Sequence, residues 1–261
     1  MRSRCSDSPP RLSSIGKLQA GFLNSLGDQL RQRQLPSEII VRMTVMTIGA
    51  HWQARQSASL GPAGEDPQLN ARRHQAETHS LNLLLAVYTE YVSVSLAEVD
   101  EALAIRNGES AIDDDDELEP ALHVHISAIL RRMLPALRIF SKWLKLHTDY
   151  LSRVQRSGQL SGPIQHFWDC YRKLVLTLAT LFPIDYLPHL SEPIEEYIDM
   201  RGFIPLAWGM IKGKRETQHD FHPNEEQLMR IADLQVDAKL LAQTQVCSLT
   251  AATESRRTER S

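Results

Sequence analysis

Carboxylates, imidazoles and thiols are the side chains of this sequence that could bind a metal ion or catalyse a reaction. Six acidic residues in seven follow one another from Asp113 to Asp116 and on to Glu117 and Glu119. A calcium loop alternates its oxygen ligands around a glycine, whereas four adjacent aspartates point in all directions. The run therefore indicates a solvated linker whose like charges repel one another, placed just before a helix that begins near Pro120.

Two histidine pairs are close enough in sequence to suggest a shared metal ion. His123 and His125 are two residues apart, which places them about 200° apart on a helix, so they cannot chelate one ion. His219 and His222 remain as a pair, without a His-Glu-x-x-His signature. A metal-dependent enzyme would need an ion at this pair or at the acidic run, and we expect no metal and no other cofactor.

The nucleophiles of the sequence do not predict an enzyme. There is no Gly-x-Ser-x-Gly, no Gly-rich phosphate loop and no Cys-x-x-Cys. Cys5, Cys170 and Cys247 are an odd and widely spaced set, which fits a reducing compartment better than a disulfide framework. Cys170 lies beside Trp168 and Tyr171 at helical spacing, where a thiol more often packs than reacts. We expect no catalytic residue.

One window of the sequence could bind phosphates. Arg201, Lys212, Lys214 and Arg215 lie between residues 201 and 215, a stretch that contains no acidic residue. The whole chain does not favour nucleic acid, because 29 Lys plus Arg face 32 Asp plus Glu and the net charge is -3. Four basic residues on a loop are also an ordinary surface, so nucleic-acid contact and plain solvation both remain open.

Apolar side chains recur at steps of three and four along most of the chain. The ladders are Ile15-Leu18-Phe22-Leu26-Leu30, Ile39-Met43-Met46-Ala50 with Val41-Val45-Ile48-Trp52, Leu81-Leu84-Tyr88-Val92-Val99-Leu103, Leu122-Ile126-Ile129-Met133-Leu137-Phe140-Leu144, Ile164-Trp168-Tyr171-Val175-Leu178-Phe182 and Leu228-Ile231-Leu234-Leu241. Convincing two-residue alternation is absent. The sequence therefore predicts an all-α protein of about six helices, packed as long antiparallel hairpins in a bundle or a short α-solenoid.

The composition of the connecting segments predicts the domain limits. We expect one helical-hairpin domain over residues 12–245, with disordered ends at residues 1–11 and 246–261 that lack apolar periodicity. Surface loops are predicted at about 56–70, which contains two Pro and two Gly, and at about 108–119. No segment approaches about 18 uninterrupted apolar residues, so we expect a soluble protein that does not span a membrane.

The stretch IDMRGFIPLAW, residues 198–208, combines a Gly, a Pro and many apolar side chains. Helices on both sides argue against a strand, and no Lys-Ser follows that would make it a phosphate loop. We predict a buried apolar loop in which Gly202 supplies a turn, Pro205 rigidifies the exit and Arg201 stays at the surface. The side chains expected to fill the space between helices are Phe203, Ile204, Leu206 and Trp208.

A set of packing positions in the second half of the chain has a characteristic order. These positions are Phe167, Trp168, Tyr171, Leu178, Ala179, Phe182, Pro183, Leu187 and Pro188, then Glu195, Glu196, Gly202, Phe203, Pro205 and Leu206. Their order resembles the central helical region of the Ever Shorter Telomeres and SMG family of telomerase-associated and nonsense-mediated-decay adaptors, particularly the fungal members. Segments 35–52, 134–144 and 224–242 resemble its other helices, so the likeness covers residues 15–245.

The resemblance implies a non-enzymatic scaffold of helical hairpins of the DNA/RNA-binding type. Such an adaptor would act in mRNA decay or telomere maintenance, in the nucleus or the cytoplasm, through protein partners of those machineries and through RNA or single-stranded DNA. No membrane contact is expected. Relatives carry a 14-3-3-like domain with a phosphopeptide pocket, and some carry a PIN nuclease domain, but no residue of this chain matches either. Direct binding of single-stranded RNA or DNA by the 201–215 segment is the alternative function.

Overall fold

The computed structural model describes residues 12–60, 66–109, 122–188, 194–206 and 221–258. Its α-helices are α1 Leu12–Arg31, α2 Ser37–Ser59, α3 Pro67–Glu109, α4 Ala128–Arg156, α5 Ser161–Leu181, α6 Glu195–Asp199 and α7 Pro223–Thr258. Three short 3-10 helices are η1 Leu122–His125, η2 Ile184–Tyr186 and η3 Ile204–Leu206. No strand occurs in these residues, so the predicted all-α class is confirmed.

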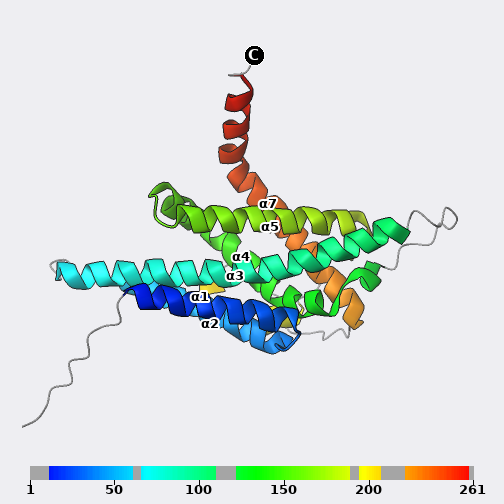
Figure 1. Cartoon of the computed structure of the whole chain (residues 1–261), viewed down its shortest axis with the longest axis horizontal. Coiled ribbons are helices and arrows are strands. Elements are labelled where there is room, and N and C mark those ends of the chain that lie inside the picture. The colour runs from blue at the N-terminus through cyan, green and yellow to red at the C-terminus, as the bar shows by residue number, and fades with distance from the viewer. Residues whose placement is uncertain (1–11, 61–65, 110–121, 189–193, 207–220, 259–261) are drawn as a thin grey trace, which may run out of the picture.

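Helix α3 is the axis of the molecule (Figure 1). Its 43 residues extend over about 64 Å. Helices α1 and α2 pack on one side of α3 and α5 packs on the other, while α4 lies between α2 and α7. By length and composition α3 could also cross a membrane, but half of its most apolar window is buried inside the fold. That burial is the pattern of a central core helix.

The core is built around aromatic side chains from three helices. Tyr88 and Tyr91 of α3, Phe140 and Trp143 of α4, and Phe167 of α5 are all at most 1% exposed. Neighbouring rings in this set meet edge to face or stacked, which are favourable arrangements for aromatic pairs. These side chains, of which Tyr88 and Phe140 belong to the predicted apolar ladders, pack α3, α4 and α5 together.

A tight turn joins α4 to α5. Ser157 ends α4, Gly158 has φ +78°, and Leu160 has φ 54° just before α5 begins. A positive φ is easy for glycine and uncommon for leucine, so the turn reverses the chain within four residues. This reversal places Gln159 beside the start of α3.

The apolar loop packs against the middle of α2. Gly202 takes φ +82°, as the predicted turn requires, and Pro205 and Leu206 are buried. A methyl group added at Gly49 of α2 would lie 3.8 Å from the Phe203 ring, so the loop contacts the helix backbone closely. Ile204 is a correction, because it is 62% exposed rather than packed. Trp208 lies outside the described residues.

Two apolar ladders are buried differently from the prediction. On α1, Leu26 and Leu30 are buried but Leu18 is 72% exposed and Phe22 43% exposed. Helix α1 packs mainly against α3, which covers only the second half of the ladder. On α2, the buried residues are Ile40, Thr44, Ile48 and His51. Two of these residues are polar, so a search for apolar side chains at helical spacing does not find this buried face.

Helices extend further than the composition indicates. Helix α2 continues to Ser59 and α3 begins at Pro67, so much of the loop predicted at 56–70 is helical. Proline suits the first turn of a helix, where its missing N–H costs nothing. Helix α3 ends at Glu109, and the remainder of the predicted loop 108–119 lies outside the described residues.

The predicted disordered tail at 246–261 is corrected as well. Helix α7 continues to Thr258 and extends beyond the other helices (Figure 1). Alanine, glutamate and arginine are strong helix formers even where no apolar ladder marks a buried face. Residues 259–261 and the predicted disordered residues 1–11 lie outside the described part of the chain.

Candidate nucleic-acid interface

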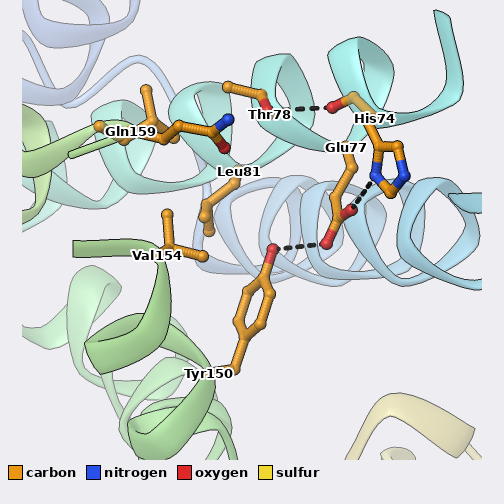
Figure 2. Close-up of a pocket in the computed structure, with 8 residues that line it drawn as sticks. His74, Glu77, Thr78, Leu81, Tyr150, Val154 and Gln159 are labelled. Carbon is orange, nitrogen blue, oxygen red and sulfur yellow. Dashed lines mark hydrogen bonds and ion pairs between the residues drawn. The ribbon is translucent and has the colours of Figure 1, made fainter. Parts of the chain in front are cut away.

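A groove lies where α2 ends, α3 begins and α4 turns into α5, and Figure 2 shows the part of it beside α3. Two adjoining hollows form it, and they share Glu77, Tyr150 and Val154. The first, here named the arginine hollow, is about 330 Å³ and is also lined by Arg55, Ser59, Arg153 and Ser157. The second, here named the Gln159 hollow, is about 240 Å³ and is also lined by His74, Thr78, Leu81, Gln159 and Leu160.

Tyr150 connects the two hollows. The guanidinium carbon of Arg55 lies 4.1 Å from the centre of the Tyr150 ring, which is a cation–π contact. The Tyr150 hydroxyl donates to Glu77 Oε1 at 2.9 Å, and Glu77 Oε2 lies 3.6 Å from His74 Nδ1 (Figure 2). Burial first, and then this bond to Glu77, raise the pKa of Tyr150, so the hydroxyl keeps its proton at neutral pH.

Arg55 and Arg153 supply the positive charge of the arginine hollow. Among the described residues, no carboxylate lies within 4.0 Å of either guanidinium, whereas Arg31, Arg42 and Arg230 all have such partners. Arg153 is exposed, and its Nε donates only to the Asp149 carbonyl at 3.4 Å. N–H groups of both guanidinium groups are therefore able to donate hydrogen bonds to an external anion.

His51, whose ring contacts the Tyr150 ring, is uncharged at neutral pH. His51 is 1% exposed, and burial first, then the charges of Arg55 and His147, lower its pKa from 6.5 to about 4. Ser80 donates its proton to the Glu77 carbonyl, so it accepts from His51 Nδ1 at 3.1 Å, and Nε2 is left without a partner. Burial likewise lowers the pKa of His147, with Arg55 adding to the effect.

Comparison with known protein families identifies the domain. A family model described as the Est1 DNA/RNA binding domain matches residues 7–208, most of the chain. The chain belongs to the Est1 DNA/RNA binding domain family. No curated protein and no solved structure matches it. Every residue that lines the groove lies inside the matched range of this Est1-type domain, whereas α7 lies beyond it.

The structure describes only one residue of the predicted basic cluster. Arg201 is exposed in the turn that precedes η3 of the Est1-type domain. Lys212, Lys214 and Arg215 lie outside the described residues, so no geometry brings the four together. They also follow residue 208, where the family match ends. Nucleic-acid contact by this segment stays a prediction.

The family positions predicted from the sequence are packing positions. Phe167, Phe182 and Leu206 are fully buried, and Tyr171 is 6% exposed. Trp168 is half-buried against the core, and Pro183 starts η2 in an extended conformation. These side chains therefore join α5 and the apolar loop to the core of the Est1-type domain.

Only some of the histidines and carboxylates considered for metal binding lie in the described part of the chain. Among the residues that the structure describes, no group of three His, Cys, Asp or Glu could hold an ion. His123 and His125 lie on η1, and His222 is exposed before α7. His219 and the acidic run from Asp113 to Glu119 lie outside the described residues.

A buried layer of charges between α4 and α7 was not expected. Lys142 lies 2.7 Å from both Asp233 and Asp237, and Lys145 lies 2.6 Å from Asp237. Arg138 pairs with Asp233 from the previous turn of α4. Burial alone would raise the pKa of Asp233, but Arg138 and Lys142 outweigh it and lower the pKa below its usual value. Each cation of this layer has a carboxylate partner on α7, which indicates a structural role.

Sequence reasoning missed Arg55, Tyr150 and Arg153. Tyr150 and Arg153 lie one turn apart near the end of a basic helix, and that spacing was the only local signal. Arg55 is 95 residues from Tyr150 in the sequence, and nothing in its own segment indicates the contact. Only the packing of α2 beside α4 brings the two side chains together.

Proposed function

We propose that this Est1-type domain is a non-enzymatic helical scaffold that binds single-stranded RNA or DNA in the groove. The observation that carries the proposal is the arginine hollow, where Arg55 and Arg153 have no carboxylate partner among the described residues. The family name, Est1 DNA/RNA binding domain, supports a nucleic-acid ligand. Family members are binding and adaptor domains, which supports a function without catalysis.

The chemistry of the hollow suits a phosphate backbone. An arginine presents several N–H donors in a planar fork that matches two oxygens of one phosphate. Tyr150 positions the Arg55 fork through its ring face, which lowers the conformational entropy that Arg55 loses on binding. Contacts to phosphates alone do not read a base sequence, so this part of the groove would bind RNA and DNA of many sequences.

The cellular role follows from the resemblance to the decay and telomere adaptors. We propose that the scaffold acts in mRNA decay or telomere maintenance, in the nucleus or the cytoplasm, and that protein partners from those machineries bind it. The exposed side chains of Leu18 and Phe22 on α1 leave an apolar surface in this structure that a protein partner could cover.

Binding of fluorescein-labelled single-stranded oligonucleotides to the whole chain tests the proposal. We expect the double variant Arg55→Gln/Arg153→Gln to bind roughly tenfold or more weakly, since each charge-assisted contact contributes about 1 kcal/mol or more. The matched control is Arg172→Gln/Lys173→Gln, which removes two exposed charges from the middle of α5 and leaves the groove intact. Equal affinity for the two double variants would exclude the groove as the binding site.

The second candidate function places the same ligand on the 201–215 segment. Its support is the acid-free window with Arg201, Lys212, Lys214 and Arg215. The variant Lys212→Ala/Lys214→Ala/Arg215→Ala distinguishes the two candidates in the same assay. A large loss in this variant, with none in the Arg55 and Arg153 variant, would favour the segment over the groove.

A further inference from the structure

We propose that the Gln159 hollow binds one nucleobase and prefers guanine, while the neighbouring phosphate binds Arg55 and Arg153. This inference rests on the proposed function, because it adds a base subsite to the groove that would bind the strand. The two hollows share Glu77, Tyr150 and Val154, so one nucleotide could reach both. The subsite would give the domain a base preference that phosphate contacts cannot supply.

The size and walls of the hollow suit a flat base. Pockets for drug-sized ligands occupy about 300–1,000 Å³, and this hollow, at about 240 Å³, is of the scale of a smaller ligand such as one base. Leu81, Val154 and Leu160 line it with apolar surface. Leu81 belongs to the core and is 1% exposed, so this wall is rigid. A base could replace water against these side chains without moving the helices.

The carboxylate of Glu77 determines the preferred base. Its side chain is 20% exposed, and two oxygens have room for about four hydrogen bonds, of which Tyr150 occupies one and His74 approaches another. Guanine presents N1–H and N2–H₂ side by side, so one carboxylate can accept both. Uracil and thymine place their single N3–H between two carbonyl oxygens, which the carboxylate repels. Adenine and cytosine offer one amino group each, so we expect the hollow to bind them more weakly than guanine and more tightly than uracil or thymine.

The polar contacts around Glu77 fix it before a ligand arrives. Tyr150 donates to Oε1 (Figure 2), and the Tyr150 ring itself contacts Arg55 and the His51 ring. A carboxylate that is already oriented loses little freedom on binding. Gln159 enters from the α4–α5 turn, and its amide has no hydrogen bond to another described residue. This amide can therefore donate to or accept from the other polar atoms of the base.

A set of labelled RNA octamers tests the subsite on the whole chain. The octamers are oligouridine and oligouridine with one central G, A or C. We expect the octamer with one G to bind about tenfold more tightly than oligouridine, the size of discrimination that a two-bond contact gives. The variant Glu77→Gln should remove this preference, because an amide cannot accept two hydrogen bonds from guanine with one oxygen and one NH₂ group. The readout is the ratio of the affinities for the octamer with one G and for oligouridine, which should fall to about one in this variant.

A second variant tests the hollow without changing Glu77, in case the substitution of Glu77 disturbs the local structure. Gln159 is exposed in the turn, so Gln159→Trp should fill the hollow without disturbing the core. It should also abolish the guanine preference. Equal binding of all four octamers by the unchanged protein, or a preference that survives both variants, would overturn the base subsite and leave the proposed function standing. Failure to bind any octamer at low salt would overturn the proposed function and the subsite together.

Discussion

His51 packs against the Tyr150 ring as a neutral imidazole, and its Nε2 has no hydrogen-bond partner among the described residues. Its pKa of about 4 in the folded protein is below the ordinary value of 6.5, so the unfolded chain binds more protons between these pH values. The free energy of unfolding therefore decreases as the pH falls from 6.5 toward 4. A shift of this size corresponds to roughly 3 kcal/mol when it is fully expressed.

Urea denaturation between pH 7.5 and 4.5 measures this effect. We expect the transition midpoint to fall most steeply below pH 6.5, and the variant His51→Asn to show a shallower dependence. Asparagine can still donate to Ser80 but does not gain a proton in this range. The same pH dependence in the variant and the unchanged protein would show that His51 is not the group responsible.

Leu206 and Ile204 are two similar side chains in one 3-10 helix with opposite environments. Leu206 is 0% exposed and Ile204 is 62% exposed. We expect Leu206→Ala to lower the free energy of unfolding by about 2–5 kcal/mol because it leaves a cavity, and Ile204→Ala by less than about 1 kcal/mol. Chemical denaturation measures both. Equal losses would contradict the packing of this loop against α2 and α4.

At the scale of elements, α7 is joined to α4 by charges as well as by apolar contacts. Asp237 is 1% exposed and accepts from Ser141 at 2.6 Å as well as from Lys142 and Lys145. Without Asp237, Asp233 would be left to balance both Arg138 and Lys142, and an excess of positive charge is costly in the low-dielectric interior. The α4–α7 contact should therefore depend strongly on this one carboxylate.

Replacement of Asp237 tests the charged layer. We expect Asp237→Ala to destabilise the protein by about 3–5 kcal/mol, and Lys145→Ala, whose side chain is 30% exposed, by at most about 1 kcal/mol. Thermal or urea unfolding compares the two variants. If Asp237→Ala proved as mild as Lys145→Ala, water would have to solvate Lys142 and the layer would not be closed.

The sequence predicted the elements better than their contacts. Apolar periodicity indicated the helices of an all-α fold, and Phe167, Phe182 and Leu206 were correctly predicted as packing positions. The buried polar residues were not predicted, because apolar periodicity gives no signal for side chains such as Thr44 and His51 of α2. The groove could not be predicted, since its residues come from three helices and a turn that only the tertiary packing brings together.

At the scale of the whole molecule, the net charge of -3 does not attract nucleic acid, so binding must depend on local charge. For single strands, the logarithm of the association constant falls with the logarithm of salt concentration by about 0.7 per neutralised phosphate. We expect Arg55→Gln/Arg153→Gln to reduce the magnitude of this slope by roughly 0.7, because both guanidinium groups bind the same phosphate. A slope that did not change would mean that neither arginine contacts the backbone.

Photo-crosslinking tests the position of the bound strand most directly. The whole chain would be irradiated with a single-stranded RNA that carries one 4-thiouridine, and the crosslinked peptides would be identified by mass spectrometry. The groove predicts crosslinks in peptides that contain residues 74–81 and 150–160, and their loss in Arg55→Gln/Arg153→Gln. Crosslinks confined to residues 201–220, or spread equally over the surface in both proteins, would contradict the groove as the nucleic-acid interface.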